Sequence, residues 1–341
     1  MAKAVIFDKK NILVIGGAGF IGSHLCNHLI SGDKVICLDN FLTGDEFNIT
    51  HLFSNIDFEF INHDITNVID LEHQRELDKF KIEFQGLQEI YFLASPASPK
   101  AYLNYPIETM LANSLGLKNA LDLAVKYKAK FLYASGPAVY GEPGNNELLK
   151  EDYVGKVDHL NERACHAEAQ RFGEALVNNY RLKYDLDTKI VRIFNCYGPN
   201  MKLEDGRMIP EFIKNALKGV DLTIYGNKDS FSSYFFIEDL IKGIDKMMES
   251  GEKGPINLAS EWKNNFSEVA EKIIKLTGSK SKIVYSQADN IIAVPQDLAD
   301  ITLAKENLGW FPVILLEEGI QKTIDYLSAQ REILRPSKIK A

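Results

Sequence analysis

The sequence predicts an α/β protein with a doubly wound parallel sheet and a smaller C-terminal α/β lobe. Three observations predict this class: short apolar runs rich in β-branched residues, helical patterns that alternate with them, and a glycine-rich turn directly after the first run. Strand–helix alternation is typical of a parallel sheet that helices cover on both faces. We expect the larger domain to span residues 1–196 and the smaller lobe 197–341, with elements of the two interleaved.

Six strands are expected in the first part of the chain, each an apolar run that ends at a turn or a polar residue. They are residues 11–16, 34–39, 58–62, 89–94, 130–135 and 188–194. A helix from about Phe20 to Ser31 follows the first strand, and long helices are expected at 107–127 and 162–183. The charged segment 71–86 is expected to be a surface insertion.

After Tyr197 the alternation fades, and helical patterns mix with short strands. The helices are expected near 208–219, 237–249 and 265–277, and the strands at 222–226 and 282–286. We expect these elements to form a lobe over the carboxyl edge of the sheet, where ligands of open α/β sheets bind.

Composition narrows the classes of function. The chain of 341 residues has a net charge of −8 and no basic stripe, which argues against a nucleic-acid or membrane surface. The spacing of the cysteines fits neither a zinc site nor a disulfide framework, so no metal and a reducing cytoplasmic location are expected. The N-terminus lacks the pattern of a signal peptide, and no apolar run is long enough to span a membrane.

A glycine-rich turn, GGAGFIG at residues 16–22, follows the first strand and opens a helix. Gly16, Gly19 and Gly22 have the spacing of a tight turn, a close backbone approach to a pyrophosphate and a close helix–strand contact. Asp39 ends the second strand, where a carboxylate accepts hydrogen bonds from the adenosine ribose and repels a 2′-phosphate. The pattern predicts a Rossmann-like domain that binds NAD rather than NADP. The alternative for Asp39 is a turn residue at a strand end.

Further residues at the same edge of the predicted sheet are expected to contact the dinucleotide. They are Phe20, Ile21, Asn40, Asp64, Ile65, Leu93, Ala94 and Ser95. The side chain of Asp64 suits the adenine edge, and a simple turn residue is the alternative reading.

Several motifs resemble those of one family, and they occur in order over nearly the whole chain. They include GGAGFIGSHL (16–25), HDIT (63–66), LASPASP (93–99), EDYVG (151–155), RIFNCYGP (192–199) and DGRMIP (205–210). Together they resemble the extended short-chain dehydrogenase/reductase family of NAD-dependent epimerases and dehydratases. Within it the chain is most similar to the UDP-glucuronate decarboxylases, which make UDP-xylose. The pairing of LASPASP with the segment from EDYVG to Cys165 is the specific part.

The resemblance implies NAD as cofactor, a nucleotide sugar as substrate and a defined reaction. In the family, a tyrosine takes the proton of the C4 hydroxyl while hydride passes to NAD, the keto acid loses carbon dioxide, and the hydride returns. A lysine one helical turn on lowers the pKa of the tyrosine and holds the nicotinamide ribose. The family's dimers also imply a homodimer through the helices 107–127 and 162–183.

The chain departs from the family at the catalytic positions. His166 and Gln170 stand where the family has its tyrosine and lysine. The loop after the fifth strand replaces two hydroxyl groups and a carboxylate by Gly136, Pro137 and Ala138, although Ser135 before it matches. We expect His166 to act as acid/base, with Gln170 bonded to the nicotinamide ribose and Ser135 nearby. The alternative for His166 is a helix histidine bonded to a neighbour or to solvent.

The nucleotide end of the substrate site is altered as well. The residues expected to bind the substrate are Asn195, Arg207 and Tyr225. Asn200, Ser232 and Asp297 stand at or near places where the family has arginines. An arginine–phosphate contact contributes roughly 1.5–3 kcal/mol, so losing two or three weakens binding of a UDP-sugar by about 10²-fold or more.

Three functions remain open from the sequence. The first is an NAD-dependent lyase, epimerase or oxidoreductase that acts on a nucleotide sugar with His166 as acid/base. The second is a catalytically silent NAD(H)-binding pseudoenzyme that regulates or scaffolds a related enzyme. The third is RNA binding, against which the acidity and the lack of a basic patch both count.

Overall fold

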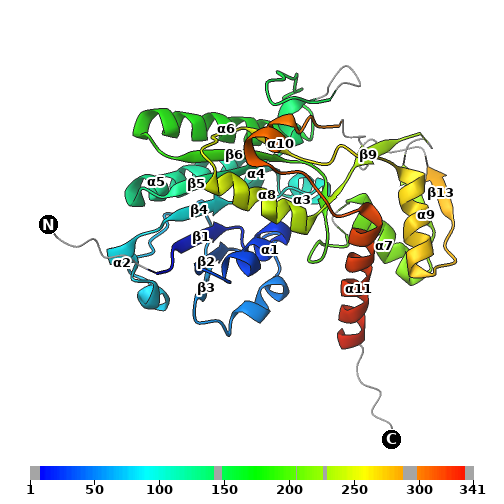
Figure 1. Ribbon diagram of the computed structural model, residues 1–341, viewed down its shortest axis with the longest axis horizontal. Coiled ribbons are helices and arrows are strands. Elements are labelled where there is room, and N and C mark those ends of the chain that lie inside the picture. Colours follow the sequence, from blue (N-terminus) through cyan, green and yellow to red (C-terminus); the bar gives the residue numbers. More distant parts are fainter. Residues whose placement is uncertain (1–7, 142–147, 205, 226–228, 287–297, 335–341) are drawn as a thin grey trace, which may run out of the picture.

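A seven-stranded parallel sheet forms the centre of the computed structural model, which describes residues 8–141, 148–204, 206–225, 229–286 and 298–334 (Figure 1). The strand order is β11-β6-β5-β4-β1-β2-β3, and every neighbouring pair is parallel. The strands are β1 (Asn11–Ile15), β2 (Lys34–Asp39), β3 (Phe58–Asn62), β4 (Glu89–Phe92), β5 (Lys130–Ser135), β6 (Thr188–Ile193) and β11 (Ile256–Leu258). The predicted doubly wound α/β class is confirmed, and β11 is a seventh strand that was not predicted.

The order of the strands reverses at β1, which lies between β2 and β4. The two halves of the chain therefore leave the carboxyl ends of β1 and β4 in opposite directions and open a crevice there. All five residues of β1 are buried. Because side chains alternate along a strand, Ile12 and Val14 join one apolar cluster while Leu13 and Ile15 join the other.

Helices cover both faces of the sheet. On one face α1 (Phe20–Leu29) packs against α8 (Ile237–Glu249), which also contacts β5 and β6. On the other face α5 (Leu117–Tyr127) packs against α6 (Ala164–Tyr184) and the same central strands. The sheet is thus buried on both sides, as near-continuous apolar strands require.

The helix predicted over 107–127 is continuous but not regular. A short helix α3 (Pro99–Asn104) ends before Pro106, and α4 (Pro106–Leu111) leads through a π-helical turn, η4 (Ala112–Gly116), into α5. Both η4 and α4 pack against α6. Apolar periodicity predicts the length of such a helix, but a single wide turn leaves no signal in it.

The charged segment 71–86 is better anchored than expected. It forms a 3₁₀ helix η3 (Arg75–Phe80) and a short helix α2 (Ile82–Gln85). Leu71, Leu77, Phe80 and Ile82 are buried in the core of the α5 face. The expectation of a surface insertion is therefore wrong for these four side chains.

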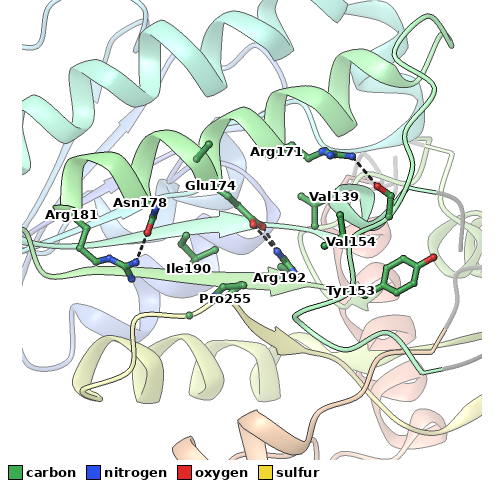
Figure 2. A pocket seen from close by; sticks show the side chains of 13 residues that line it. Val139, Tyr153, Val154, Arg171, Glu174, Asn178, Arg181, Ile190, Arg192 and Pro255 are labelled. Carbon is green, nitrogen blue, oxygen red and sulfur yellow. Dashed lines mark hydrogen bonds and ion pairs between the residues drawn. The ribbon is translucent and has the colours of Figure 1, made fainter. Parts of the chain in front are cut away.

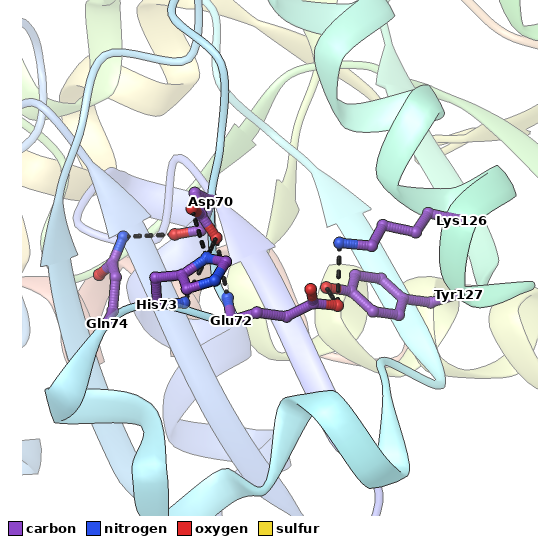
Figure 3. Close-up of polar contacts among 6 residues, drawn as sticks. All are labelled: Asp70, Glu72, His73, Gln74, Lys126 and Tyr127. Carbon is purple, nitrogen blue, oxygen red and sulfur yellow. Dashed lines mark hydrogen bonds and ion pairs between the residues drawn. The ribbon is translucent and has the colours of Figure 1, made fainter.

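Polar contacts tie the start of this segment to α5 (Figure 3). The carboxylate of Glu72 accepts a hydrogen bond from the hydroxyl of Tyr127 at 2.9 Å and lies 2.9 Å from the ammonium of Lys126. One oxygen of Asp70 accepts from the backbone amides of Glu72 and His73 and from the His73 ring. The cluster is partly exposed, with Glu72 and Tyr127 half-buried, and its contacts hold the loop against α5.

The smaller lobe lies beside the carboxyl end of the sheet, at the opposite end of the molecule from α2 (Figure 1). Its helices are α7 (Met208–Lys218), α9 (Phe266–Thr277) and α11 (Leu316–Leu334). The helix α10 (Thr302–Leu308) packs instead on β11 and α8. Its strand pairs are β7 (Cys196–Tyr197) with β10 (Phe235–Phe236), β8 (Leu222–Tyr225) with β13 (Ile283–Ser286), and β9 (Phe231–Ser233) with β12 (Lys263–Asn265).

The chain returns from this lobe to the large sheet. Both α8 and β11 follow residue 196 in sequence, yet α8 covers the sheet and β11 pairs with β6. The division at 196/197 stays a prediction, with these two elements crossing it. In the described part of the chain no helix is both long and apolar enough to cross a membrane.

Candidate active site and cofactor-binding residues

The glycine loop between β1 and α1 is closed to side chains at Gly16 and Gly22. Gly16 has a φ of +82°, and a Cβ there would lie 2.7 Å from the backbone nitrogen of Ala94. A Cβ on Gly22 would lie 2.1 Å from the carbonyl oxygen of Gly16. Gly19 occupies the N-cap of α1, whose first turn contains Phe20 and Ile21, and no side chain caps the helix. The first amides of α1 are therefore available to an anion.

Asp39 lies beside this loop at the end of β2. It is buried, its Oδ2 accepts from the amide of Ala18 at 3.0 Å, and its Oδ1 accepts from the amide of Phe41 at 2.8 Å. Burial raises the pKa of Asp39. Hydrogen bonds from backbone amides, including the amide of the exposed Asn40, lower this pKa. The amides of Ala18 and Phe41 hold the carboxylate of Asp39 in one orientation at the crevice, beside the glycine loop.

Asp64 and Ile65 follow β3 and differ in their surroundings. Asp64 is exposed, and its Oδ1 accepts from the amide of Thr66 at 2.9 Å and from its hydroxyl at 2.8 Å. The bond from that amide lowers the pKa of Asp64. Ile65 is buried beneath η4, where a Cβ on Gly116 would approach it to 2.7 Å. These bonds fit the turn-residue reading of Asp64, and its contact with adenine stays a prediction.

The segment after β4 is held by a polar chain that the sequence did not predict. The amide of Leu93 donates to the carbonyl of Ile15 at 2.8 Å, which keeps residues 93–95 beside the glycine loop. The hydroxyl of Ser95 accepts from the side-chain amide of Asn113 at 2.8 Å, and the Asn113 carbonyl accepts from the hydroxyl of Tyr133 at 2.8 Å. Asn113 lies in η4, so the π-helical turn serves to aim it at Ser95.

His166 and Gln170 lie one helical turn apart on α6, and each leaves a polar atom without a partner. The His166 ring stacks on Tyr102, with 4.9 Å between ring centroids and 9° between planes, and its Nδ1 is buried and unbonded. The Oε1 of Gln170 is likewise buried and unbonded among the described residues. A Cβ on Gly136 would lie 3.2 Å from this Oε1. Buried polar atoms are normally satisfied, so among the described residues the Gln170 oxygen lacks a donor and the His166 Nδ1 lacks a hydrogen-bond partner.

Charge at His166 is disfavoured. Burial, together with the positive charge of Arg207, lowers the pKa of the imidazole to about 4. The ring is therefore neutral at pH 7 and is a weaker base than a free histidine.

Ser135 does not join His166 and Gln170. Its hydroxyl donates to Oε1 of Glu174 at 2.7 Å. Glu174 in turn forms a forked ion pair with Arg192, whose Nε and Nη2 lie 2.9 and 2.7 Å from the two carboxylate oxygens (Figure 2). The guanidinium also lies over the ring of Tyr140, 4.6 Å from its centroid. The hydroxyl of Ser135 thus donates its hydrogen bond to Glu174. The catalytic role expected for Ser135 stays a prediction.

Each of the residues expected at the nucleotide end has its own surroundings. The amide of Asn195 donates to the hydroxyl of Ser232 at 2.7 Å, and Ser232 is buried. Arg207, just before α7, donates to the carbonyl of Ala97 at 3.3 Å. Tyr225 is half-buried at the end of β8.

Asn200 links α1 to α11 through its side chain. It has a φ of +65°, its side-chain amide donates to the hydroxyl of Ser23 on α1 at 3.0 Å, and its carbonyl accepts from the hydroxyl of Tyr326 on α11. Asp297 lies outside the described residues. Among the residues that the structure describes, no group of His, Cys, Asp and Glu could hold a metal ion.

Residues 12–259 match the model of the NAD dependent epimerase/dehydratase family. The chain belongs to this family. It is 37% identical over 329 residues to UDP-glucuronic acid decarboxylase 1 of Xenopus tropicalis, covering 95% of the chain and 74% of the relative. It is 38% identical over 317 residues to UDP-glucuronic acid decarboxylase 1 of Arabidopsis thaliana, covering 93% and 69%.

Solved structures of this family include complexes with NAD. One is the UDP-glucuronic acid 4-epimerase from Bacillus cereus in complex with NAD, which superposes on the chain with a TM-score of 0.78 at 26% identity. The alignment covers 94% of the chain and 99% of the epimerase. The resemblance inferred from the motifs is thereby confirmed.

Because the pKa of His166 is low, we expect the unfolding free energy of the protein to depend on pH. Below pH 6.5 the unfolded chain binds a proton at this residue, but the folded chain does not until about pH 4, so stability falls as the pH drops through this window. Between pH 7.5 and 5.0 we expect the wild type to lose about 2 kcal/mol more unfolding free energy than His166→Phe, which keeps a ring on Tyr102. Urea unfolding at both pH values measures this. Equal losses in the two proteins would contradict the buried, neutral imidazole.

Proposed function

We propose that this family member binds NAD in the crevice at β1 and β4 and a nucleotide sugar beneath the smaller lobe, with proton handling rebuilt around His166. The observation that carries the proposal is the contrast between the two halves of the site. The glycine loop and Asp39 keep the geometry of a dinucleotide site, whereas the tyrosine and lysine positions hold two neutral side chains with unpartnered atoms.

The residues present fit NAD. The loop is closed to side chains at Gly16 and Gly22, and the amides of α1 carry no cap, so they suit the pyrophosphate. Asp39 would hold the adenosine ribose, and Gln170 would bond to the nicotinamide ribose through its free Oε1. When bound, NAD supplies a hydride acceptor for the sugar.

The proton chemistry falls to His166. Its Nδ1 is unbonded, and the neutral ring accepts a proton there, while the stacked ring of Tyr102 keeps the imidazole in place. A conjugate acid with a pKa of about 4 makes this a weak base near neutral pH. Gln170 offers a hydrogen bond but no positive charge. The site therefore supports binding better than fast turnover.

Calorimetric titration with NAD tests the proposal through Asp39. We expect Asp39→Asn to weaken NAD binding about tenfold or more, because hydrogen bonds from the ribose hydroxyls to a charged acceptor contribute roughly 1.5–3 kcal/mol. The control is Asp78→Asn, an exposed carboxylate on η3, which should leave the affinity unchanged. Absence of NAD binding by the wild type would overturn the proposal.

The nucleotide sugar is tested by thermal shift with UDP-glucuronate, UDP and other sugar nucleotides in the presence of NAD. Stabilisation by a sugar nucleotide beyond that given by UDP supports a substrate site. Stabilisation by NAD alone favours the second candidate, a catalytically silent pseudoenzyme. The commitment of Ser135 to Glu174 and the weak basicity of His166 support that alternative.

We also propose a cytoplasmic homodimer. Four free cysteines fit a reducing compartment. Where α4 and η4 pack against α6, five large apolar side chains are 42–61% exposed: Ile107, Met110, Leu111, Leu115 and Phe172. A patch of this kind on two packed helices suits a self-complementary interface.

Charge placed on this patch should separate the subunits. We expect Leu111→Glu with Phe172→Glu to convert a dimer into a monomer, as measured by light scattering after size exclusion. Val220→Glu is the matched control, since Val220 is an exposed apolar residue that follows α7 in the smaller lobe. A wild type that is monomeric at all concentrations would contradict the dimer.

A further inference from the structure

A hollow beside α6 is not used by the proposed chemistry. It has a volume of about 360 Å³ and lies between α6, the segment 153–155 and the turn at Gly254–Pro255 before β11 (Figure 2). This volume falls in the range of roughly 300–1,000 Å³ that is usual for small-molecule sites. The hollow uses the helix face with Arg171, Glu174, Asn178 and Arg181, and not the buried positions of His166 and Gln170.

The lining carries a strong positive charge for so acidic a protein. Among the described residues that line the hollow, three are arginines, Arg171, Arg181 and Arg192, and one is an acid, Glu174. The formal charge of this set is +2, three positive charges less one negative, in a chain whose net charge is −8. An anion is therefore attracted to this place on the surface.

The three arginines are not equivalent. Arg192 is satisfied by the fork with Glu174 and by the carbonyl of Glu151 at 2.8 Å, so it belongs to the framework. Arg171 donates only a long bond of 3.4 Å to the carbonyl of Gly155, and Arg181 donates to the neutral side chain of Asn178. No ion pair involves either of them in the part of the chain that is described. Both are half-buried, and their charges are uncompensated.

The spacing of the two arginines indicates the shape of the ligand. They are ten residues apart on α6, a rise of about 15 Å, and Figure 2 shows them at opposite ends of the hollow. Val139, Val154, Ile190 and Pro255 line the part between them, together with the ion pair of Glu174 and Arg192. Guanidinium groups bind phosphate and carboxylate oxygens in pairs. We propose that this hollow binds an elongated organic anion with acidic groups at both ends.

Two probes test the site and separate its chemical sources. Fructose 1,6-bisphosphate represents phosphates and adipate represents carboxylates, each titrated calorimetrically into NAD-saturated protein at constant ionic strength. We expect one molecule of at least one probe to bind per chain. Each of Arg171→Gln and Arg181→Gln should weaken binding about tenfold, and the double variant about 10²-fold. Arg75→Gln, an exposed arginine on η3, is the control and should bind like the wild type.

A further variant tests the site without removing any side-chain contact of the two arginines. Ala175 is exposed on the same face of α6, so Ala175→Glu adds a negative charge without removing a contact and should abolish binding. Unchanged NAD affinity in all variants shows that they fold and separates this site from the dinucleotide site. Failure of both probes to bind the wild type, or equal binding by the double variant, overturns the proposal.

Discussion

Gly22→Ala is expected to weaken NAD binding strongly and to destabilise the fold. The added Cβ would lie 2.1 Å from the carbonyl of Gly16 and 2.7 Å from the Cα of Gly17, and both are backbone atoms that no rotamer change can move. Either α1 or the glycine loop must shift. We expect the unfolding free energy to fall by about 3 kcal/mol and NAD affinity by about 10²-fold or more.

The control for this change is Gly32→Ala. Gly32 lies just after α1, and a Cβ there would meet nothing within 4 Å. Alanine favours a helix over glycine by about 1 kcal/mol, so Gly22→Ala would stabilise an unconstrained α1. Urea unfolding and calorimetric titration with NAD on both variants measure the difference. A Gly22→Ala protein that keeps wild-type affinity would show that the loop has more space than the structure gives it.

UDP-glucuronate decarboxylation by this protein is expected to be at least about 10⁴-fold slower than that of an active relative assayed in parallel. A positioned acid/base group contributes typically ~10²–10⁴-fold, and the missing tyrosine and lysine act as a unit, so their losses do not add. The imidazole that replaces the phenol has a pKa of about 4. Formation of UDP-xylose, followed by chromatography, measures the rate, and a rate near that of the relative would contradict the argument.

Restoring the two helix residues should not be enough. We expect His166→Tyr with Gln170→Lys to stay near the wild-type rate, because the loop after β5 still lacks two hydroxyl groups and a carboxylate. Adding Gly136→Thr, Pro137→Ser and Ala138→Glu should then raise the rate above that of the double variant. NAD affinity measured on each variant separates a folding defect from a catalytic one. Full activity in the double variant alone would show that the loop matters less than we infer.

The sheet could be predicted because its strands leave a strong local signal. The six predicted strands are buried runs of β-branched and apolar residues, and each was placed within two residues of its observed end. The seventh strand, β11, has only three residues, Ile256–Leu258, and so is too short to distinguish from a loop. The π-helical turn η4 and the burial of Leu77, Phe80 and Ile82 depend on tertiary contacts that periodicity does not record.

The candidate site could be predicted in part. A glycine run and a strand-end acid have fixed spacing, and the structure places Gly16 and Gly22 in the turn between β1 and α1 and Asp39 at the end of β2. Their contact with a dinucleotide stays a prediction. The partners of these residues come from distant segments. Asn113 reaches Ser95 from η4, and Glu174 takes the hydroxyl of Ser135 from α6. Such pairs lie close only in the folded structure, so no local sequence pattern predicts them.

The return of α8 and β11 to the large sheet limits how the molecule can be re-engineered. A chimaera that borrows the whole of 197–334 from an active relative would also replace the helix that covers α1 and the strand that pairs with β6. The foreign helix and strand would then have to match this chain's apolar surface. A transplant with a better chance of folding takes two pieces, 197–236 and the part after Leu258, and keeps this chain's own α8 and β11, so that the foreign α10 is the helix that must fit them.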